Sequence, residues 1–322
     1  MIIRNAMIHD AVHPEPYAGD ILVRDGKIVS VGGTAAGLPD EILDAAGLNA
    51  YPGFIDAHSH IGLDGYGGPT GMTYDFNEVN DICCPQLRGL DSYYSMDGAI
   101  PLALAGGVTT VATGPGSANV LGGTFFAVKL YGKTVEETMI KPAIGMKCAF
   151  GENPKRCYRE KCDSARMTTA AKLREMLFEA REYMLRKEAA GDDLMKRPKF
   201  DMKMEALIPV IRKEIPLKAH VHRSDDIMTA IRIAREFDVN ITIEHCTEGH
   251  LIVDELKKAD VPVAVGPTLT NVSKPELLNK SWTTPGILAR AGIRVSIITD
   301  APVIPQQYLP LCAGLEIGRA HV

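Results

Sequence analysis

The sequence predicts an α/β protein, a TIM-like (β/α)8 barrel preceded by a small β-unit. From Tyr51 onward, short apolar runs alternate with helical stretches. Such runs are typical of parallel strands that are buried on both faces and separated by helices. Seven runs are clear and 123–130 can be an eighth, and this number favours a closed barrel over an open sheet. The seven runs are 54–57, 108–112, 143–150, 217–221, 240–243, 261–265 and 294–298.

The first 50 residues differ from the rest, because they are rich in short strands and turns. Asp25-Gly26 is a strong hairpin signal between two apolar segments. We therefore expect two domains, residues 1–50 and residues 51–322. The predicted strands of the first domain are 1–8, 19–24 and 27–31.

Two helical stretches of the second domain have clear sequence signals. Asp163 and Ser164 can cap a long helix that runs through Arg186, with Gly191 as its stop. Residues 225–237 carry apolar side chains at helical spacing with charges opposite, as expected of a helix that covers a sheet.

Composition excludes several classes of partner. A formal net charge of -5 and a pI near 6.0 leave no basic surface for nucleic acid. No uninterrupted apolar run is long enough to span a bilayer, and no secretory signal is visible. The seven cysteines are scattered, as in proteins with reduced thiols. We expect a cytoplasmic protein without a nucleic-acid or membrane partner.

The strongest chemical signal is the pair His58 and His60 at the end of the first apolar run. Residues two apart in a strand point to the same side, so both imidazoles can converge on one ion. Neutral imidazole is a good zinc ligand, and the active sites of such barrels lie at the carboxyl ends of the strands.

Three further strand ends carry side chains of the same kind. His220 and His222 end one predicted strand, His245 ends the next, and Asp300 ends the last. Carboxyl ends of barrel strands meet on one face, so these side chains are expected to gather there. The sequence therefore predicts a metal site.

These residues carry a resemblance to a known family. The series 52–60, His220, 243–245 and Asp300 resembles the amidohydrolase superfamily, in which the chain is most similar to the imidazolonepropionase-like metal-dependent hydrolases. The subgroup resemblance depends on 151–156, 220–226 and 266–268, whereas Ala301 stands where close relatives often carry histidine.

The resemblance implies a ligand set. His58 and His60 match the first-strand ligands, and His220 and His245 match those of the fifth and sixth strands. Asp300 matches the eighth-strand aspartate. We expect a divalent metal, zinc above all, as one or two ions. The family also implies that residues 1–50 are part of a small β-sandwich, normally completed by C-terminal strands.

A further ligand is expected at the end of the fourth strand, where the family has either a glutamate that bridges two metals or a carboxylated lysine. Glu152 is favoured and Lys147 is the alternative. With a bridge, two metals about 3.5–4 Å apart become feasible. His222 is expected to contact substrate, and Arg223 to receive a substrate carboxylate or phosphate. The glycine-rich stretches 62–71 and 114–123 are expected to be substrate loops.

The predicted reaction is hydrolysis of a C–N bond, in an amide, a cyclic amide or a dipeptide. Asp300 would act as general base and then acid on a metal-activated water, and His245 would help to stabilise the oxyanion. The alternatives are lactone hydrolysis, deamination on the same site, and a non-catalytic scaffold. The sequence has no G-x-G-x-x-G dinucleotide motif. We expect a small-molecule substrate and allow a homo-oligomer.

Few residues follow Asp300. Residues 301–322 leave little room for a last helix and none for returning sandwich strands, and 316–322 resemble a translated sequencing adapter. We therefore expect a barrel that is truncated after its eighth strand, beside an incomplete sandwich.

Overall fold

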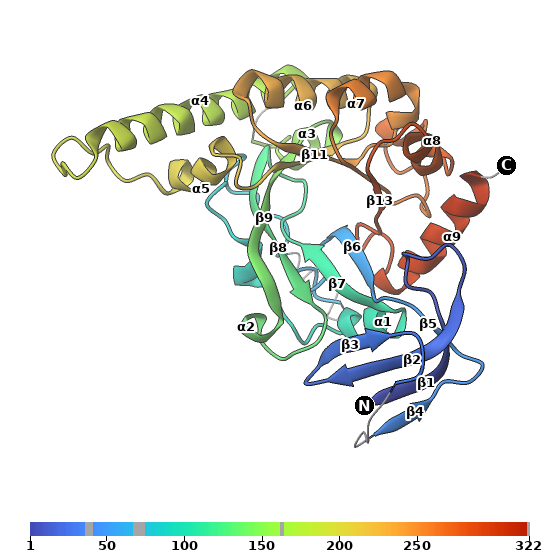
Figure 1. Ribbon diagram of the computed structural model, residues 1–322. Helices are drawn as coiled ribbons and strands as arrows, with labels where there is room; N and C mark the ends of the chain where they lie inside the picture. Colours follow the sequence, from blue (N-terminus) through green and yellow to red (C-terminus); the bar gives the residue numbers. More distant parts are fainter. Residues whose placement is uncertain (36–40, 67–74, 162–163, 321–322) are drawn as a thin grey trace. The chain divides into compact units, whose positions relative to one another are not determined.

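The structure, a computed structural model, describes residues 1–35, 41–66, 75–161 and 164–320. The chain divides into two compact units, Met1–Gly53 and Phe54–Val322. Each unit is built around its own sheet, as Figure 1 shows by its colours, dark blue for the first unit and lighter blue to red for the second.

The first unit is a five-stranded sheet in the order β3-β2-β1-β4, with β5 also paired to β1. Asp25 and Gly26 both have positive φ, 50° and 70°, which is the requirement of a two-residue turn between antiparallel strands. The predicted hairpin is thereby confirmed, whereas the part that this sheet plays in a sandwich stays a prediction. The strands are β1 Ile2–Ile8, β2 Tyr17–Arg24, β3 Lys27–Val31, β4 Ile42–Asp44 and β5 Asn49–Ala50.

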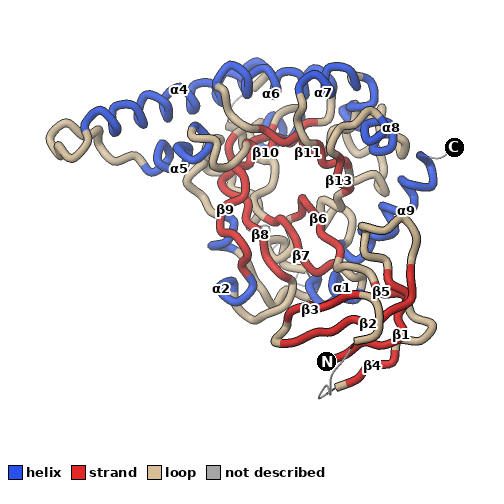
Figure 2. Tube along the Cα trace, in the orientation of Figure 1, coloured by secondary structure: helices blue, strands red, loops and turns tan. Residues whose placement is uncertain are grey.

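The second unit is the predicted barrel. Its eight strands follow one another in the order β13-β12-β11-β10-β9-β8-β7-β6, and Figure 2 shows them as a ring with helices outside it. The strands are β6 Phe54–Ser59, β7 Val108–Thr113, β8 Leu121–Lys129, β9 Met139–Ala149, β10 Leu217–Val221, β11 Ile241–His245, β12 Val263–Val265 and β13 Val295–Ile297.

Helices cover the outer face of the sheet. The largest apolar cluster joins strands β9 to β11 to three helices through buried side chains such as Leu177, Leu207 and Ile231. The α-helices are α1 Ala99–Ala105, α2 Val135–Thr138, α3 Glu152–Cys157, α4 Arg166–Ala190, α5 Met202–Ile211, α6 Ser224–Phe237, α7 Val253–Ala259, α8 Thr284–Arg290 and α9 Leu309–Ala320. The short 3-10 helices are η1 Gly89–Ser92, η2 Gly249–Leu251, η3 Pro275–Leu277 and η4 Gln306–Tyr308.

The two predicted helices are present as α4 and α6. Helix α4 ends at Gly191, whose φ of 50° suits glycine, as the sequence predicted. The predicted cap Asp163 lies outside the described residues. Among the helices that the structure describes, none is both long and apolar enough to cross a membrane.

One strand differs from the expected parallel barrel. Strand β8 is the predicted eighth strand, but it runs antiparallel to both β7 and β9. A parallel strand needs a crossover of a dozen residues or more, and only residues 114–120 separate β7 from β8. The short connection therefore forces β8 to return alongside β7, and the other neighbouring strands of the barrel pair in parallel.

The ring is closed where the chain after β13 meets β6. The Asp300 amide donates to the His58 carbonyl at 3.2 Å, and the His60 amide donates to the Ala301 carbonyl at 2.7 Å. Beside them lies the fully buried Asp56. Its Oδ2 accepts hydrogen bonds from the Thr299 amide at 3.1 Å, the Thr299 hydroxyl at 2.6 Å and the Gln306 side chain at 2.6 Å.

We predict that Asp56→Ala lowers the free energy of unfolding by about 3 kcal/mol or more, because several buried donors lose a carboxylate acceptor. Burial raises the pKa of Asp56 to about 6, so urea unfolding at pH 7.5 compares the ionised form. Asp91→Ala, at an exposed carboxylate paired with Arg88, is the control and should change the value by less than about 0.5 kcal/mol. Equal unfolding midpoints for the two variants would refute the closing role of Asp56.

Candidate metal centre

The barrel brings the predicted side chains together at the carboxyl ends of four strands. His58 and His60 lie at the end of β6, His220 and His222 at the end of β10, and His245 is the last residue of β11. Asp300 follows β13. Parallel strands present these ends on one face of a barrel, which is why residues far apart in sequence meet.

Unusual backbone geometry orients two of these side chains. His245 has a φ of 70° and Asp300 a φ of 54°, in the left-handed region that non-glycine residues rarely adopt. In β11 the side chain of Glu244 already contacts that of His58. Regular alternation would point the next residue away, so the turn of the backbone at His245 brings its imidazole to the same face.

The first group of candidate ligands consists of His58, His60 and Asp300. Asp300 Oδ1 lies 3.6 Å from His58 Nε2 and 3.4 Å from His60 Nε2. Both histidines are buried, and potential ligand atoms of all three residues lie within 4.8 Å of one another. The group therefore has the spacing needed to surround one ion.

The second group consists of His220, His222 and His245, all buried, with potential ligand atoms again within 4.8 Å of one another. The ring of His245 lies 4.4 Å from that of His220 and 5.2 Å from that of His58, measured between centroids. His245 thus stands between the two groups, and the two groups form one continuous site.

Hydrogen bonds fix the orientation of the imidazoles. His60 Nδ1 lies 2.7 Å from the Gly114 carbonyl, His245 Nδ1 lies 2.8 Å from the Gly266 carbonyl, and His58 Nδ1 lies 2.8 Å from Glu244 Oε2. Carbonyl and carboxylate oxygens accept hydrogen bonds, so the Nδ1 of each of these imidazoles carries the proton and donates. The Nε2 atom therefore keeps a lone pair that can bind a metal. Second partners of this kind are usual for histidines that bind metals through the other nitrogen.

Two Nε2 atoms of the site are buried without a hydrogen-bond partner among the residues that the structure describes, those of His222 and His245. A buried polar atom without a partner is costly, and native proteins rarely leave one. A metal ion would satisfy both atoms. The donor set of neutral imidazoles and one carboxylate fits zinc and similar divalent metals.

The electrostatics of the site favour neutral imidazoles. Burial lowers the pKa of His245 to about 4 and holds the pKa values of His58, His220 and His222 well below their usual range. Burial alone would raise the pKa of Asp300, but the nearby His245, His60 and His58 outweigh it and bring that pKa below its ordinary value. The carboxylate is therefore ionised at neutral pH.

Lys147, the alternative bridging residue, lies inside the site. It is a fully buried residue of β9, and its Nζ lies 3.1 Å from His58 Nε2. The same Nζ stands 5.3 Å from the centre of the Phe125 ring. Burial lowers the pKa of Lys147 to about 8.

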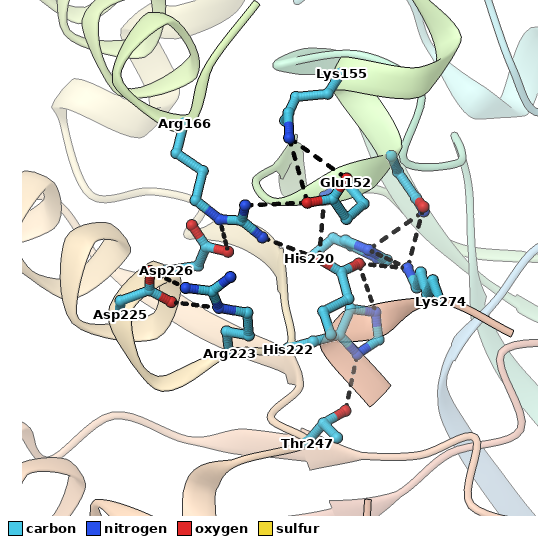
Figure 3. A network of polar contacts seen from close by, with 12 residues as sticks. Glu152, Lys155, Arg166, His220, His222, Arg223, Asp225, Asp226, Thr247 and Lys274 are labelled. Carbon is cyan, nitrogen blue, oxygen red and sulfur yellow. Dashed lines mark hydrogen bonds and ion pairs between the residues drawn. The ribbon is translucent and has the colours of Figure 1, made fainter. Parts of the chain in front are cut away.

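Glu152, the favoured bridging residue, does not join either group. Its Oε1 lies 3.3 Å from Lys155 Nζ and 3.0 Å from Arg166 NH1, and the side chain is partly exposed (Figure 3). The contacts therefore favour Lys147 over Glu152, and the identity of the bridging residue stays a prediction. The physical reason is that Glu152 begins helix α3, beyond the end of β9, where two cations hold its carboxylate.

Arg223 also lies outside both groups. Its guanidinium forks onto the Asp225 carboxylate, with Nε 3.0 Å from Oδ1 and NH2 2.8 Å from Oδ2, next to the start of helix α6 (Figure 3). The expected contact of Arg223 with a substrate anion stays a prediction, and Asp225 would compete for the same guanidinium. His222, by contrast, lies in the second group, with Nδ1 2.8 Å from Thr247 Oγ1.

Sequence reasoning missed several polar residues around His220. Lys274 Nζ lies 3.4 Å from His220 Nε2 and 2.7 Å from Oε1 of the buried Glu276, whose Oε2 accepts a hydrogen bond from the Glu152 amide. Both residues sit around η3, after the short strand β12. A lysine and a glutamate at that distance from a strand give no periodic signal, so only the fold could reveal them.

Of the two glycine-rich stretches, 114–123 reaches the site. The Gly114 carbonyl accepts a hydrogen bond from His60, and Ser117 Oγ accepts one from Asn153 Nδ2 at 2.7 Å. The stretch 62–71 lies outside the described residues from position 67 onward.

Comparison with known proteins gives relatives of the kind that the histidines suggested. No family model matches the chain. The amidohydrolase tasK of Hapsidospora irregularis is 27% identical over 339 residues, which covers 95% of this chain and 34% of that protein. An adenine deaminase of Deinococcus deserti is 32% identical over 98 residues, 27% of this chain and 18% of the enzyme. The chain thus spans about a third or less of these two relatives.

Among solved structures, an amidohydrolase from Thermotoga maritima MSB8 superposes with a TM-score of 0.94 and 41% sequence identity. The match covers 100% of this chain and 84% of that one. Similarity of this extent in both sequence and fold, over both the barrel and the first unit, means that the chain belongs to the amidohydrolase superfamily.

Proposed function

We propose that the protein hydrolyses a C–N bond of a small molecule, an amide, a cyclic amide or a dipeptide, at a divalent metal centre, with zinc as the metal. The observation that carries the proposal is the set of buried imidazoles whose Nδ1 atoms are hydrogen-bonded, which leaves their Nε2 atoms available as ligands in two clustered groups. The relatives named amidohydrolase support the reaction class.

In this proposal the metal is held by His58, His60, His220, His245 and Asp300. A divalent metal supplies a Lewis acid and lowers the pKa of water to near neutrality. The protein supplies the rest. Its buried imidazoles exclude bulk water and stay neutral, and the hydrogen bonds of Glu244, Gly114 and Gly266 hold three of the rings in fixed orientations.

Asp300 is the proposed general base. Its carboxylate lies beside two imidazoles and is ionised at neutral pH, so it can accept a proton from the attacking water and return it to the leaving nitrogen. His245 would contribute to stabilising the developing oxyanion through the metal that it would help to hold. His222 is proposed to contact substrate, because the Nε2 of His222 is buried without a hydrogen-bond partner among the described residues.

Lys147 is the proposed bridging residue in place of Glu152. Its Nζ lies 3.1 Å from His58 Nε2, and a carbamate formed there from carbon dioxide would supply two oxygens as further ligands. Two metals then become feasible. This part of the proposal depends on Lys147 alone, because Glu152 is held by Lys155 and Arg166.

Deamination is the second candidate. The observation that favours it is the relative named adenine deaminase, which aligns with about a quarter of the chain. The same residues would serve, since deamination is also attack of water at a carbon bonded to nitrogen. A scaffold without activity is disfavoured, because every expected ligand position is filled.

Metal content tests the proposed ligands. Purified protein is expected to carry about one or two equivalents of a transition metal, and His58→Ala/His60→Ala to lose most of it, because two imidazoles of one group are removed. Plasma mass spectrometry on both proteins measures this. The double variant His9→Ala/His13→Ala, in the first unit, is the control, and a folded wild type free of metal would defeat the proposal.

Substitution of Lys147 or Glu152 tests which of the two residues contributes to metal binding. Lys147→Met is expected to reduce a two-metal stoichiometry to one or to weaken metal binding by about tenfold or more, whereas Glu152→Gln should leave metal content unchanged. Dialysis against graded chelator followed by metal analysis gives the numbers. Loss of metal from Glu152→Gln alone would restore the original assignment.

Substitution of Asp300 tests its proposed role as general base. With any amide or cyclic amide that the wild type hydrolyses, Asp300→Asn should lower kcat by about 10²–10⁴-fold, since the amide cannot accept the proton. The four histidines should still retain metal. Asp254→Asn, on helix α7 away from the strand ends, is the matched control, and retained turnover in Asp300→Asn would reject the assignment.

A further inference from the structure

A cavity of about 640 Å³ opens beside His220, between the start of helix α3 and the segment around Lys274. Volumes of this size are typical of small-molecule sites. The charged and amide side chains in its lining are Glu152, Asn153, Lys155, Arg156, Arg159 and Lys274.

Two residues of the cavity lining contact one of the candidate ligands, His220. Asn153 Nδ2 lies 3.3 Å from His220 Nε2, and Lys274 Nζ lies 3.4 Å from the same atom. Lys274 also binds Asn153 Oδ1 at 3.0 Å, so the two side chains form one polar wall next to His220. A molecule that places its reacting bond at the imidazoles would extend into this cavity.

The inner charges of the cavity are already matched. Lys274 Nζ lies 2.7 Å from Glu276 Oε1, and Lys155 Nζ lies 3.3 Å from Glu152 Oε1. Arg166, just outside the lining, bonds to Glu152 at 3.0 Å and to Asp226 at 2.9 Å (Figure 3). These pairs leave little net charge near the base of the cavity.

Two arginines in the lining are different. Arg156 and Arg159 are exposed, and across the parts of the chain that the structure describes neither side chain forms an ion pair or a hydrogen bond. The lining therefore holds a surplus of positive charge, and this surplus lies on guanidinium groups. Guanidinium groups match carboxylate and phosphate in a two-pronged geometry.

We propose that this cavity is the subsite for an anionic group of the substrate, a carboxylate or a phosphate, which Arg156 and Arg159 bind. The inference rests on the proposed function and deepens it, because it selects amides that carry an anion on the part away from the reacting bond. The role that the sequence suggested for Arg223 passes to these two residues, since Asp225 occupies the Arg223 guanidinium.

The test is binding of matched probes to the purified protein by calorimetry. N-acetylglycine carries the carboxylate, N-acetylglycinamide lacks it, and inorganic phosphate represents the other anion. Wild type should bind N-acetylglycine or phosphate about tenfold tighter than N-acetylglycinamide, and added salt should weaken the anion selectively. If N-acetylglycine binds more tightly than phosphate, the group that the cavity binds is a carboxylate; if phosphate binds more tightly, the group is a phosphate.

The double variant Arg156→Gln/Arg159→Gln should lose that preference. Both residues are exposed, so the variant is expected to fold, and circular dichroism checks this. Arg186→Gln, an exposed arginine of helix α4 outside the cavity, should behave as wild type. An anion preference that survives in the double variant, or is absent from wild type, overturns the inference.

Anion binding tests the subsite, and amide hydrolysis tests the proposed function, so each can fail without the other. Anion binding that needs the two arginines, in a protein that hydrolyses no amide, would sink the hydrolase proposal and leave the subsite standing. Hydrolysis of acid and carboxamide substrates with equal kcat/KM would support the hydrolase proposal and sink the subsite.

Discussion

Closure of the barrel is the constraint on which the candidate metal centre depends. Asp300 can lie beside His58 and His60 only if the chain after the last strand returns to the first. The backbone hydrogen bonds between Asp300 and His58, and between His60 and Ala301, make that return in the immediate neighbourhood of the site. The buried carboxylate of Asp56 supports the same junction through Thr299 and Gln306. One junction therefore closes the fold and assembles half of the proposed ligands.

Positive and negative side chains lie close together in the buried interior of the site. Two buried lysines, Lys147 and Lys218, stand near two carboxylates, Glu244 and Asp300. Glu244 Oε1 lies 3.0 Å from Lys218 Nζ, and its Oε2 binds His58. An isolated buried charge is expensive, and pairing reduces that cost. The imidazoles can thus remain neutral in a region that holds four ionisable groups besides them.

Local rules predicted the barrel and most of the candidate site. Alternation of side chains along a strand was enough to predict that His58 and His60 point to the same side. Positions at strand ends were enough to predict that His220, His245 and Asp300 lie on the same face of the barrel. Alternation fails at His245, where the left-handed backbone brings two consecutive side chains into the barrel. The direction of β8 also escaped prediction, because it depends on the length of one loop rather than on the apolar pattern.

The other polar residues around the site could be placed only from the three-dimensional fold. Glu152 and Lys147 are only five positions apart, and the predicted strand 143–150 includes Lys147 but does not tell whether the side chain of Lys147 lies beside the histidines. Lys274 and Glu276 have no periodic pattern, and their contacts with His220 and Glu152 arise from the packing of distant segments.

Gly151 joins the strand that carries Lys147 to the helix that carries Arg156. Its φ is 75°, and a Cβ added there would lie 2.4 Å from Glu276 Oε2. The junction is therefore confined to glycine by its backbone and by a buried carboxylate at once. A single residue thus fixes how the strand that carries Lys147 passes into the helix that lines the cavity, so the two regions are coupled through one glycine.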